Sequence, residues 1–388
     1  MIARTTSEAE LEPIRTAVLA LCARFPGEYW RDLDRVRGYP HEFVAALTEA
    51  GYLAALIPEE FGGSGLTISA ACAILEEIHH AGCNGAACHA QMYTMGTVLR
   101  HGSAEQKKQV LPAIARGELR LQAFGVTEPT SGTDTLSLRT TAVRDGNSGY
   151  IVNGQKIWTS RAEHSDLMLL LARTTPREQA KTRTDGLSVF LVDMRAVSGL
   201  TIRPIRTMMN HATTEMFFDN MRIPADSLIG EEGNGFRYIL SGMNAERILI
   251  ASECVGDAKW FIDKANSYAK ERIIFGRAIG ANQGVQFPIA RCYMQMRSAE
   301  LMVHEAAQRY EQGEQCGEQA NMAKQLAAEA SWAAADMCVQ THGGFGFAEE
   351  FDIERKFRET RLYTVAPIST NGVLSYIAEH VLNMPRSY

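Results

Sequence analysis

The sequence of 388 residues lacks several features that would assign it to a secreted, membrane or nucleic-acid-binding class. Its apolar runs, such as Leu167 to Ala172, are too short to cross a membrane, and none at the N-terminus is long enough for a signal peptide. Basic residues are also in the minority, since 39 Lys and Arg stand against 45 Asp and Glu, whereas proteins that grip nucleic acid carry excess positive charge. We therefore expect a cytoplasmic protein that binds neither membrane nor nucleic acid.

Paired cysteines and complete dinucleotide-binding motifs are lacking as well. The eight cysteines include no CxxC, and no histidine pair stands at zinc spacing, so we predict buried free thiols and no metal site. The clusters Gly233-Asn234-Gly235 and Gly344-Phe345-Gly346 are followed by Tyr238 and Glu349 where GxGxxG needs its third glycine. We interpret both clusters as loops at helix boundaries.

Three stretches of different character follow one another along the chain, and its length allows two or three domains. Residues 1–120 are helical: Ser7 to Glu10 and Ser103 to Gln106 read as capping boxes, and Thr67 to Ala81 is apolar at helical spacing. Residues 231–388 are helical too, with long segments near 233–272, 282–312, 318–341 and 371–383 that suggest a bundle.

Residues 121–230, between the helical stretches, are predicted to form a compact β domain. Asn153-Gly154 separates Tyr150 to Val152 from Lys156 to Trp158, which predicts a hairpin because both turn residues tolerate positive φ. Further strands are expected at Leu167 to Ala172, Leu187 to Val192, Leu200 to Ile205 and Thr214 to Phe218. The fold class is therefore mainly α with a central β domain, and the α, β, α order disfavours a doubly wound sheet.

Four blocks carry a resemblance to a known family. They are FGVTEPTSGTD (Phe124 to Asp134), NGQKIWTS (Asn153 to Ser160), ERIIFGRAIGANQ (Glu271 to Gln283) and QTHGGFGF (Gln340 to Phe347). In this order and at these spacings the chain resembles the acyl-CoA dehydrogenases. The resemblance implies an N-terminal helical domain, a middle β-barrel and a C-terminal four-helix bundle. It also implies a homotetramer, built as a dimer of dimers, with one FAD per subunit.

The resemblance also assigns residues to the cofactor. Along the flavin edge it places Phe124, Val126 and Thr127; Thr133 would reach the pyrophosphate, Trp158 would stack near the ring, and the Ser160 hydroxyl would lie at N5. The FAD of a neighbouring subunit would be touched by Arg272, Phe275, Gln283, Gln340 and Gly344, and a further cofactor-contacting stretch includes Ser369 and Asn371. Taken singly, Trp158 could be core packing, Arg272 a solvated helix end and Gly344 a turn residue.

The reaction of this family needs a carboxylate that removes the α-proton of the acyl group while a hydride leaves the β-carbon for flavin N5. Many members carry that base in the C-terminal block, where this chain has Pro367. The isovaleryl-CoA and long-chain branches carry it on the first long helix of the bundle, where Glu246 and Arg247 match. Glu246 also shares a helical stripe with Ile239, Met243 and Ile250, and the alternative is an ion pair between Glu246 and an arginine.

Pro367 raises a second question, because the family uses a backbone N–H at this position to bind the thioester oxygen, and proline has none. The Ile368 amide could replace it, a ribityl hydroxyl could suffice, or the reaction could differ. The acyl-pocket wall is assigned by resemblance to Gln91, Met92, Met95 and Pro367, although a methionine stripe at helical spacing can equally be core. His89 and His164 are assigned structural roles.

The function predicted from the resemblance is dehydrogenation of an acyl-CoA to the trans-2-enoyl-CoA, with an electron-transfer flavoprotein as electron acceptor. By analogy the position of the base favours branched or longer fatty acyl substrates. One alternative is a flavin oxidase or monooxygenase on the same fold. Another is a catalytically silent subunit that binds FAD or CoA.

Overall fold

The computed structural model describes residues 6–386, except for the side chain of Glu8, and the chain forms two compact units. The first unit contains residues 6–36, 67–85 and 244–386, and the second contains residues 37–66 and 86–243. The units thus combine segments that are far apart in the sequence. The division into domains at residues 120 and 230 stays a prediction.

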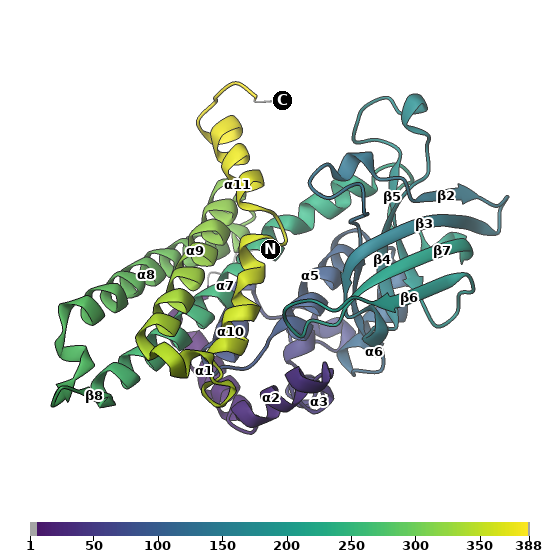
Figure 1. The fold of residues 1–388 in the computed structure, drawn as a ribbon. Coiled ribbons are helices and arrows are strands. Elements are labelled where there is room, and N and C mark those ends of the chain that lie inside the picture. Colours follow the sequence, from purple (N-terminus) through teal and green to yellow (C-terminus); the bar gives the residue numbers. More distant parts are fainter. Residues whose placement is uncertain (1–5, 387–388) are drawn as a thin grey trace. The chain divides into compact units, whose positions relative to one another are not determined.

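The first unit is a helical bundle (Figure 1). Its long helices α8 and α9 pack along one another, α10 and α11 pack on α9, and α1 and α8 both contact α4. The small hairpin β8–β9 joins α7 to α8. The bounds are α1 (Glu8–Cys22), α2 (Gly27–Val36), α4 (Ile68–His80), α7 (Gly235–Glu271), β8 (Ile273–Ile274), β9 (Arg277–Ala278), α8 (Gln283–Glu311), α9 (Gly317–His342), α10 (Ile353–Thr360) and α11 (Thr370–Tyr376). Residues 235–243 of α7 belong to the second unit.

The predicted helices and caps are present where the sequence places them. The Ser7 amide donates to Glu10 Oε2 at 2.9 Å, and Ser103 and Gln106 exchange two side-chain to backbone hydrogen bonds of 2.9 and 3.1 Å. Thr67 caps α4 by accepting from the Ala70 amide. Helix α10 was not predicted, because its eight residues, IERKFRET, carry too few apolar side chains to show a helical period.

A seven-stranded sheet forms the centre of the second unit (Figure 1). The strand order is β1-β4-β2-β3-β7-β6, with β5 also paired to β4; β4 runs parallel to β1 and β2, and the other pairs are antiparallel. The bounds are α3 (His41–Glu49), α5 (Ala86–His101), α6 (Ala104–Ala115), β1 (Leu121–Gly125), β2 (Thr141–Arg144), β3 (Gly149–Ser160), β4 (Leu167–Arg173), β5 (Leu187–Asp193), β6 (Leu200–Pro204) and β7 (Thr213–Pro224).

Strand β4 separates two apolar cores, because successive side chains of a strand point to opposite faces. Leu167, Leu169 and Leu171 join the core that includes α5 and α6 residues, whereas Met168 and Leu170 join the core on the other face. All seven residues of β4 are buried. This explains why the strand reads as a continuous apolar run rather than as an alternating one.

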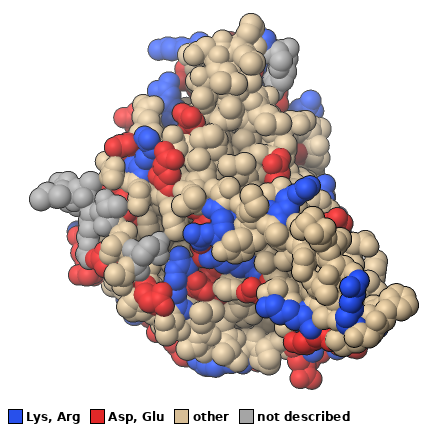
Figure 2. All heavy atoms as spheres, turned by 90° about the vertical axis from the view of Figure 1, so that its left-hand side faces the viewer, with Lys and Arg blue, Asp and Glu red and all other residues tan. Residues whose placement is uncertain are grey.

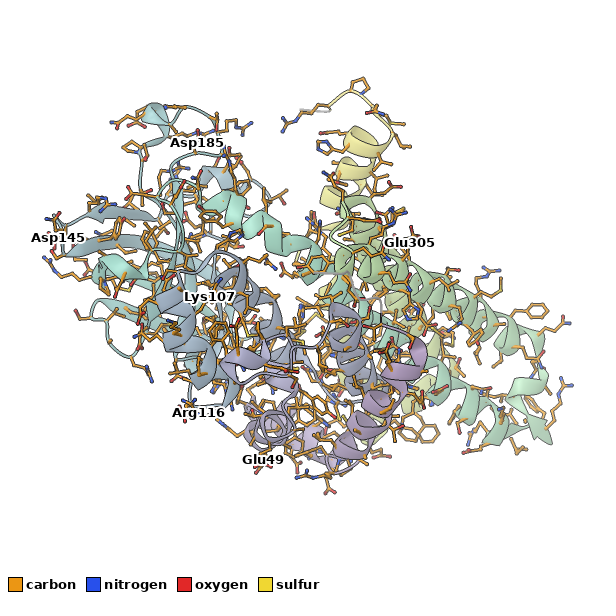
Figure 3. All side chains as sticks on the ribbon, turned by 180° about the vertical axis from the view of Figure 1, so that it is seen from behind. Glu49, Lys107, Arg116, Asp145, Asp185 and Glu305 are labelled. Atoms are coloured by element: carbon orange, nitrogen blue, oxygen red, sulfur yellow. The ribbon has the colours of Figure 1, made fainter. Side chains whose placement is uncertain are left out.

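The hairpin predicted at Asn153-Gly154 is wrong. These residues lie inside the single strand β3, where the register with β7 shifts between Val152 and Gly154. Gly154 has φ +146°, and a Cβ there would lie 2.6 Å from the Thr140 hydroxyl, so glycine permits a bulge instead of a turn. The chain reverses earlier, between β2 and β3, where Figure 3 labels Asp145 at the turn.

The cysteine prediction is confirmed, because all eight thiols are free and buried. Within residues 6–386, no helix combines the length and the apolar character that a membrane crossing requires. Basic and acidic side chains are mixed on the face seen in Figure 2.

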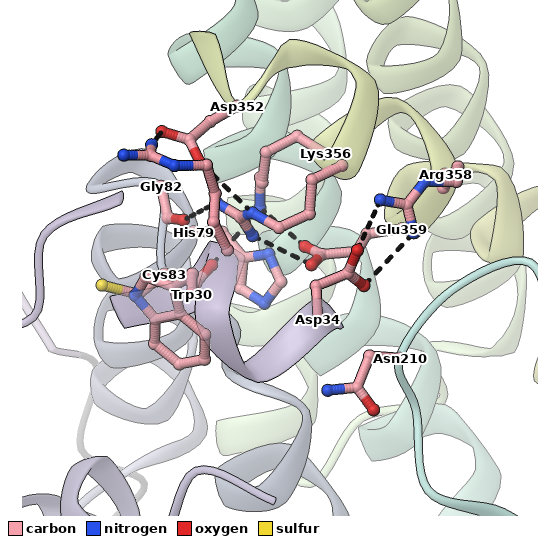
Figure 4. A network of polar contacts seen from close by, with 12 residues as sticks. Trp30, Asp34, His79, Gly82, Cys83, Asn210, Asp352, Lys356, Arg358 and Glu359 are labelled. Carbon is pink, nitrogen blue, oxygen red and sulfur yellow. Dashed lines mark hydrogen bonds and ion pairs between the residues drawn. The ribbon is translucent and has the colours of Figure 1, made fainter. Parts of the chain in front are cut away.

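A network of buried charged side chains lies in the first unit between α4, α7 and α10 (Figure 4). Lys356 and Asp257 are fully buried and form an ion pair, and His79 Nδ1 lies 2.9 Å from the same Asp257 oxygen. Burial raises the pKa of Asp257, but Lys356 and His79 offset this and the net pKa is lowered. Because the Gly85 amide donates to His79 Nε2, the imidazole carries its proton on Nδ1 and donates it to Asp257.

Candidate active site

The predicted flavin-edge residues lie in the second unit, where the chain leaves β1 and contacts β3. The Ile157 amide donates to the Thr127 carbonyl at 2.9 Å. The Lys156 ammonium donates to the Val126 carbonyl at 2.9 Å and to Glu128 Oε1 at 2.8 Å. These bonds fix the backbone that follows Phe124, so Val126 and Thr127 have one defined position beside β3.

Lys156 and Glu128 form a buried ion pair below this backbone. Burial lowers the pKa of Lys156 to about 8, against the opposing effect of Glu128. Burial raises the pKa of Glu128, but Lys156 and the amides of Arg139 and Thr140 stabilise the carboxylate, and its net pKa is lowered. Both side chains are charged at neutral pH, and no pattern in the sequence marks either residue as buried or paired.

The lowered pKa of Lys156 predicts a pH dependence of stability. In the unfolded chain lysine titrates near its ordinary pKa of about 10.4, so between about pH 8 and that value the unfolded state binds more protons. The Lys156 contribution to the free energy of unfolding should therefore increase as pH rises through this window. We expect the difference in unfolding free energy between wild type and Lys156→Met to grow from pH 8 to pH 10 when both proteins are unfolded with denaturant. A constant difference would mean that the pKa of Lys156 is not lowered in the folded protein.

Trp158 and Ser160 stand at the end of β3, next to a second shift in the β3–β7 register. Trp158 has φ 64°, and its side chain is 56% exposed, which disfavours core packing. Thr159 between them is buried. Strand alternation thus turns Trp158 and Ser160 away from the interior while Thr159 points inward.

The chemistry of this surface fits FAD. An exposed indole offers a flat aromatic face for the flavin ring, and the hydroxyls of Thr127 and Ser160 offer hydrogen-bond donors beside it. Thr133 is exposed in the loop after β1, where a hydroxyl can meet a phosphate. Donors and an aromatic face at the ends of β1 and β3 are what the isoalloxazine ring requires.

The predicted base lies in the first unit, on α7. Glu246 is 7% exposed. The neighbouring Arg247 donates from Nη1 to Asn244 Oδ1 at 3.1 Å, and its Nε is buried with no hydrogen-bond partner among the residues that the structure describes. Burial lowers the pKa of Arg247, and the charge of Glu246 opposes this effect. A buried carboxylate therefore sits beside a guanidinium that favours its ionised form.

The segment that contains Pro367 is held by Lys324 from α9. The fully buried Lys324 ammonium donates to the Ile368 carbonyl at 2.7 Å. Burial also lowers the pKa of this lysine. Ser369 then caps α11 by accepting from the Gly372 amide at 3.3 Å, and Asn371 is exposed in the first turn. Lys324 was missed from sequence because its partner is 44 residues away.

The residues predicted to touch a neighbouring subunit's FAD gather at the end of the bundle near the β8–β9 hairpin. The Arg272 guanidinium lies 5.7 Å from the ring centre of Phe345, which connects the start of the hairpin to the glycine-rich loop after α9. Phe275 has φ 53° at the hairpin tip and is fully exposed. All five are exposed within this chain: Arg272, Phe275, Gln283, Gln340 and Gly344.

The predicted pocket residues of α5 are buried in the second unit. Met95 belongs to the apolar core that contains Leu167, and Met92 and Gln91 are almost fully buried. Gln91 donates to the Leu53 carbonyl at 3.1 Å, and its Oε1 has no hydrogen-bond partner among the described residues. The assignment of these three to the acyl pocket stays a prediction, and their burial also fits the core alternative.

One group of side chains has the composition of a metal site. Carboxylate and imidazole atoms of Glu76, Glu300 and His304 lie within 4.8 Å of one another. Lys259 donates to both carboxylates, at 2.5 and 2.7 Å, and Arg15 pairs with Glu76 at 2.9 Å. Because two cations already balance these carboxylates, the group is a buried salt-bridge network.

The fold and these surfaces define a flavin-dependent oxidoreductase. Models of the three acyl-CoA dehydrogenase domains match the chain: the N-terminal domain over residues 8–118, the middle domain over 123–221 and the C-terminal domain over 233–382. The chain belongs to the acyl-CoA dehydrogenase family. It is an oxidoreductase that acts on acyl-CoA, with FAD as cofactor.

Individual relatives extend over nearly the whole chain. Acyl-CoA dehydrogenase FadE12 of Mycobacterium tuberculosis is 35% identical over 384 residues, covering 98% of this chain and 97% of the relative. The glutaryl-coenzyme A dehydrogenase in its glutaryl-CoA complex is 28% identical, with a TM-score of 0.91 over 99% of this chain and 98% of that one. The FAD complex of PigA, 23% identical, shares the fold with a TM-score of 0.90 over 98% of this chain and 99% of that one.

Proposed function

We propose that this enzyme oxidises an acyl-CoA thioester to the trans-2-enoyl-CoA and that Glu246 is its catalytic base. The proposal rests chiefly on the buried carboxylate of Glu246, which stands on α7 at the family's alternative base position, while Pro367 occupies the usual one. The Glu246 carboxylate would take the proton from the α-carbon of the acyl group. FAD, when bound, supplies the acceptor for the hydride that leaves the β-carbon.

Arg247 would keep this base ionised and oriented. Its guanidinium charge favours the carboxylate form of Glu246, and its bond to Asn244 fixes the side chain. Lys324 would position the backbone that binds the thioester oxygen. It holds the Ile368 carbonyl, and we propose that the Ile368 amide replaces the N–H that Pro367 lacks. Loss of one such donor without replacement typically costs about 2.7–4 kcal/mol at the transition state.

The remaining assignments extend this proposal. The flavin ring would be held by the surface formed by Phe124, Val126, Thr127, Trp158 and Ser160. An electron-transfer flavoprotein would receive the electrons. By analogy with the branches that share the helix-borne base, fatty or branched acyl groups are the substrates. A test is to add a panel of acyl-CoAs anaerobically and to follow the flavin absorbance. Bleaching of the flavin supports the proposal. If no thioester bleaches the flavin, the alternative of a catalytically silent subunit that binds FAD or CoA is favoured. Oxygen uptake during turnover would indicate an oxidase.

We further propose a homotetramer, supported by exposed apolar side chains in the first unit. The β8–β9 hairpin and α8 expose Ile273, Ile274, Phe275, Phe287, Met294 and Leu301. Apolar side chains gathered on a surface in this way are typical of protein–protein interfaces.

The variant Phe275→Asp is expected to break this assembly. A carboxylate at the hairpin tip would have to be buried without a partner in the interface, which is strongly unfavourable. Size-exclusion chromatography with light scattering should then show species smaller than the tetramer, with weaker FAD retention. Val143→Asp, at an exposed apolar residue on β2, is the control and should leave the assembly intact. An unchanged tetramer in Phe275→Asp would contradict the proposed interface.

A further inference from the structure

The peptide group that joins Val126 to Thr127 has its carbonyl bonded to a buried ammonium. Lys156 on β3 is fully buried, and its Nζ donates to the Val126 carbonyl at 2.9 Å. The next carbonyl, that of Thr127, accepts from the Ile157 amide at 2.9 Å. In a trans peptide the C=O and the N–H point in opposite directions. The N–H of Thr127 therefore points away from the Lys156 ammonium.

This N–H can bind a ligand. Thr127 is only partly buried, and none of the residues that the structure describes accepts a hydrogen bond from its amide. The proposed function places Phe124, Val126 and Thr127 along the flavin edge. The nitrogens and carbonyl oxygens of a flavin ring accept hydrogen bonds, and such bonds tune its electronic properties.

The ammonium on the carbonyl side makes the N–H of the same peptide a stronger donor. Hydrogen bonds that form a chain polarise one another, so Lys156 draws electrons toward the Val126 oxygen and leaves the Thr127 N–H more positive. Glu128 balances the charge of Lys156 at 2.8 Å, and Arg173 on β4 interacts with Glu128 in turn. Because Glu128 offsets the long-range field of the ammonium, Lys156 acts through its bond to the Val126 carbonyl.

We propose that Lys156 is a positioning residue that polarises the Val126–Thr127 peptide, so that the Thr127 amide binds reduced FAD more tightly than oxidised FAD. The inference rests on the proposed function, because this peptide can act on the cofactor only if it borders the flavin. Uptake of a hydride converts the neutral oxidised ring into an anionic one. A polarised N–H stabilises an acceptor more as its negative charge grows, so Lys156 raises the reduction potential of bound FAD.

The reduction potential of the bound FAD tests the role of Lys156 without any acyl-CoA, because a chemical reductant and a reference dye suffice. Lys156→Met should bind the reduced form about tenfold less tightly relative to the oxidised form, the difference between a charge-assisted and a neutral hydrogen bond. For a two-electron couple this lowers the potential by about 30 mV.

Arg173→Met is the matched control. Arg173 is also buried, and it donates to the Leu136 and Leu138 carbonyls at 2.8 and 3.4 Å, in the same segment between β1 and β2 that contains Val126. The control thus removes a buried cation from two other carbonyls of this segment. It should keep the wild-type potential even where it lowers stability.

The pH dependence of the potential separates the charge of Lys156 from its packing. Burial lowers the pKa of Lys156 to about 8, against the opposing effect of Glu128. Reduction of the flavin strengthens the bond to the Val126 carbonyl and so raises this pKa, which means that reduction takes up an additional proton. The wild-type potential should therefore fall more steeply above about pH 8 than the Lys156→Met potential, until the two converge.

An unchanged potential in Lys156→Met, with both forms of FAD bound equally less tightly, would reduce Lys156 to a structural role and overturn the inference. If this variant does not fold or loses FAD, Lys156→Met/Glu128→Gln removes both charges, leaves no buried carboxylate unpaired, and should show the same lower potential. A wild-type potential that does not steepen above pH 8 also overturns the inference. Failure of the proposed function is distinct, because the shift in potential would remain while no acyl-CoA bleaches the flavin.

Discussion

Replacing Glu246 with glutamine is expected to slow the reduction of the flavin by an acyl-CoA by about 10²- to 10⁴-fold, the usual contribution of a general base. Glutamine has nearly the same shape and accepts hydrogen bonds, but it cannot take the α-proton. Acyl-CoA binding should therefore change little, and the loss should appear in the rate of bleaching at saturating substrate. Stopped-flow absorbance under anaerobic conditions measures this rate directly.

Two further variants separate the chemistry from the packing of α7. Glu246→Asp keeps the carboxylate but withdraws it by one methylene, and a misplacement of about 1 Å can cost about a hundredfold, so a partial loss is expected. Glu253→Gln is the control, because Glu253 is also buried and lies seven residues further along the same helix. It should keep the wild-type bleaching rate. Full activity in Glu246→Gln would mean that another acid is the base.

The features that the sequence predicts correctly are those that depend on residues close to one another along the chain. The capping box of Ser103 and Gln106 and the helical stripe that contains Glu246 join residues three to seven positions apart. The hairpin at Asn153-Gly154 failed although its turn residues are well suited. The Asn153 side chain accepts from the Asn220 amide on β7, so the position of a strand 67 residues away decides between turn and bulge.

The buried basic residues that lie near candidate site residues in each unit could not be found from sequence for the same reason. Lys156 is bonded to Glu128 across 28 residues, and Lys324 to Ile368 across 44. Neither lysine has a nearby partner that would mark it as buried, and a lysine on a helix or strand is ordinarily solvated. Arg161 follows a recognisable block, but only the fold places it beside His211, 50 residues further on.

Replacing Lys356 with methionine is expected to destabilise the first unit by about 3–5 kcal/mol, because it leaves a buried carboxylate without its cation. Lys356 and Asp257 are both fully buried, and the Lys356 ammonium also donates to the Cys83 carbonyl at 3.3 Å and lies 3.5 Å from Glu359. Methionine retains most of the apolar volume of the lysine stem, so the loss reports the charge rather than a cavity. Three of the four tryptophans, Trp30, Trp260 and Trp332, belong to this unit, and their fluorescence follows its unfolding in denaturant.

The pH dependence of stability provides an independent test of the ion pair between Lys356 and Asp257. The folded pKa of Asp257 is lowered, so its stabilisation is present above the unfolded pKa of about 3.9 and is lost as pH falls toward the folded value. In Lys356→Met the carboxylate loses its main stabilising charge, and the variant should therefore lose stability at higher pH than wild type does during acid titration.

The double variant Lys356→Met/Asp257→Asn decides whether the charge pair itself is required. Replacing both members of a buried ion pair by neutral groups is often close to neutral, since the desolvation cost disappears with the attraction. The side-chain amide introduced by Asp257→Asn would still offer an oxygen to His79 Nδ1, so most of the lost stability should return. Arg35→Met removes an exposed ion pair with Glu349 in the same unit and should have little effect. If Lys356→Met alone unfolds at the wild-type denaturant concentration, the buried pair contributes nothing to stability, and the network shown in Figure 4 only fills space between α4, α7 and α10.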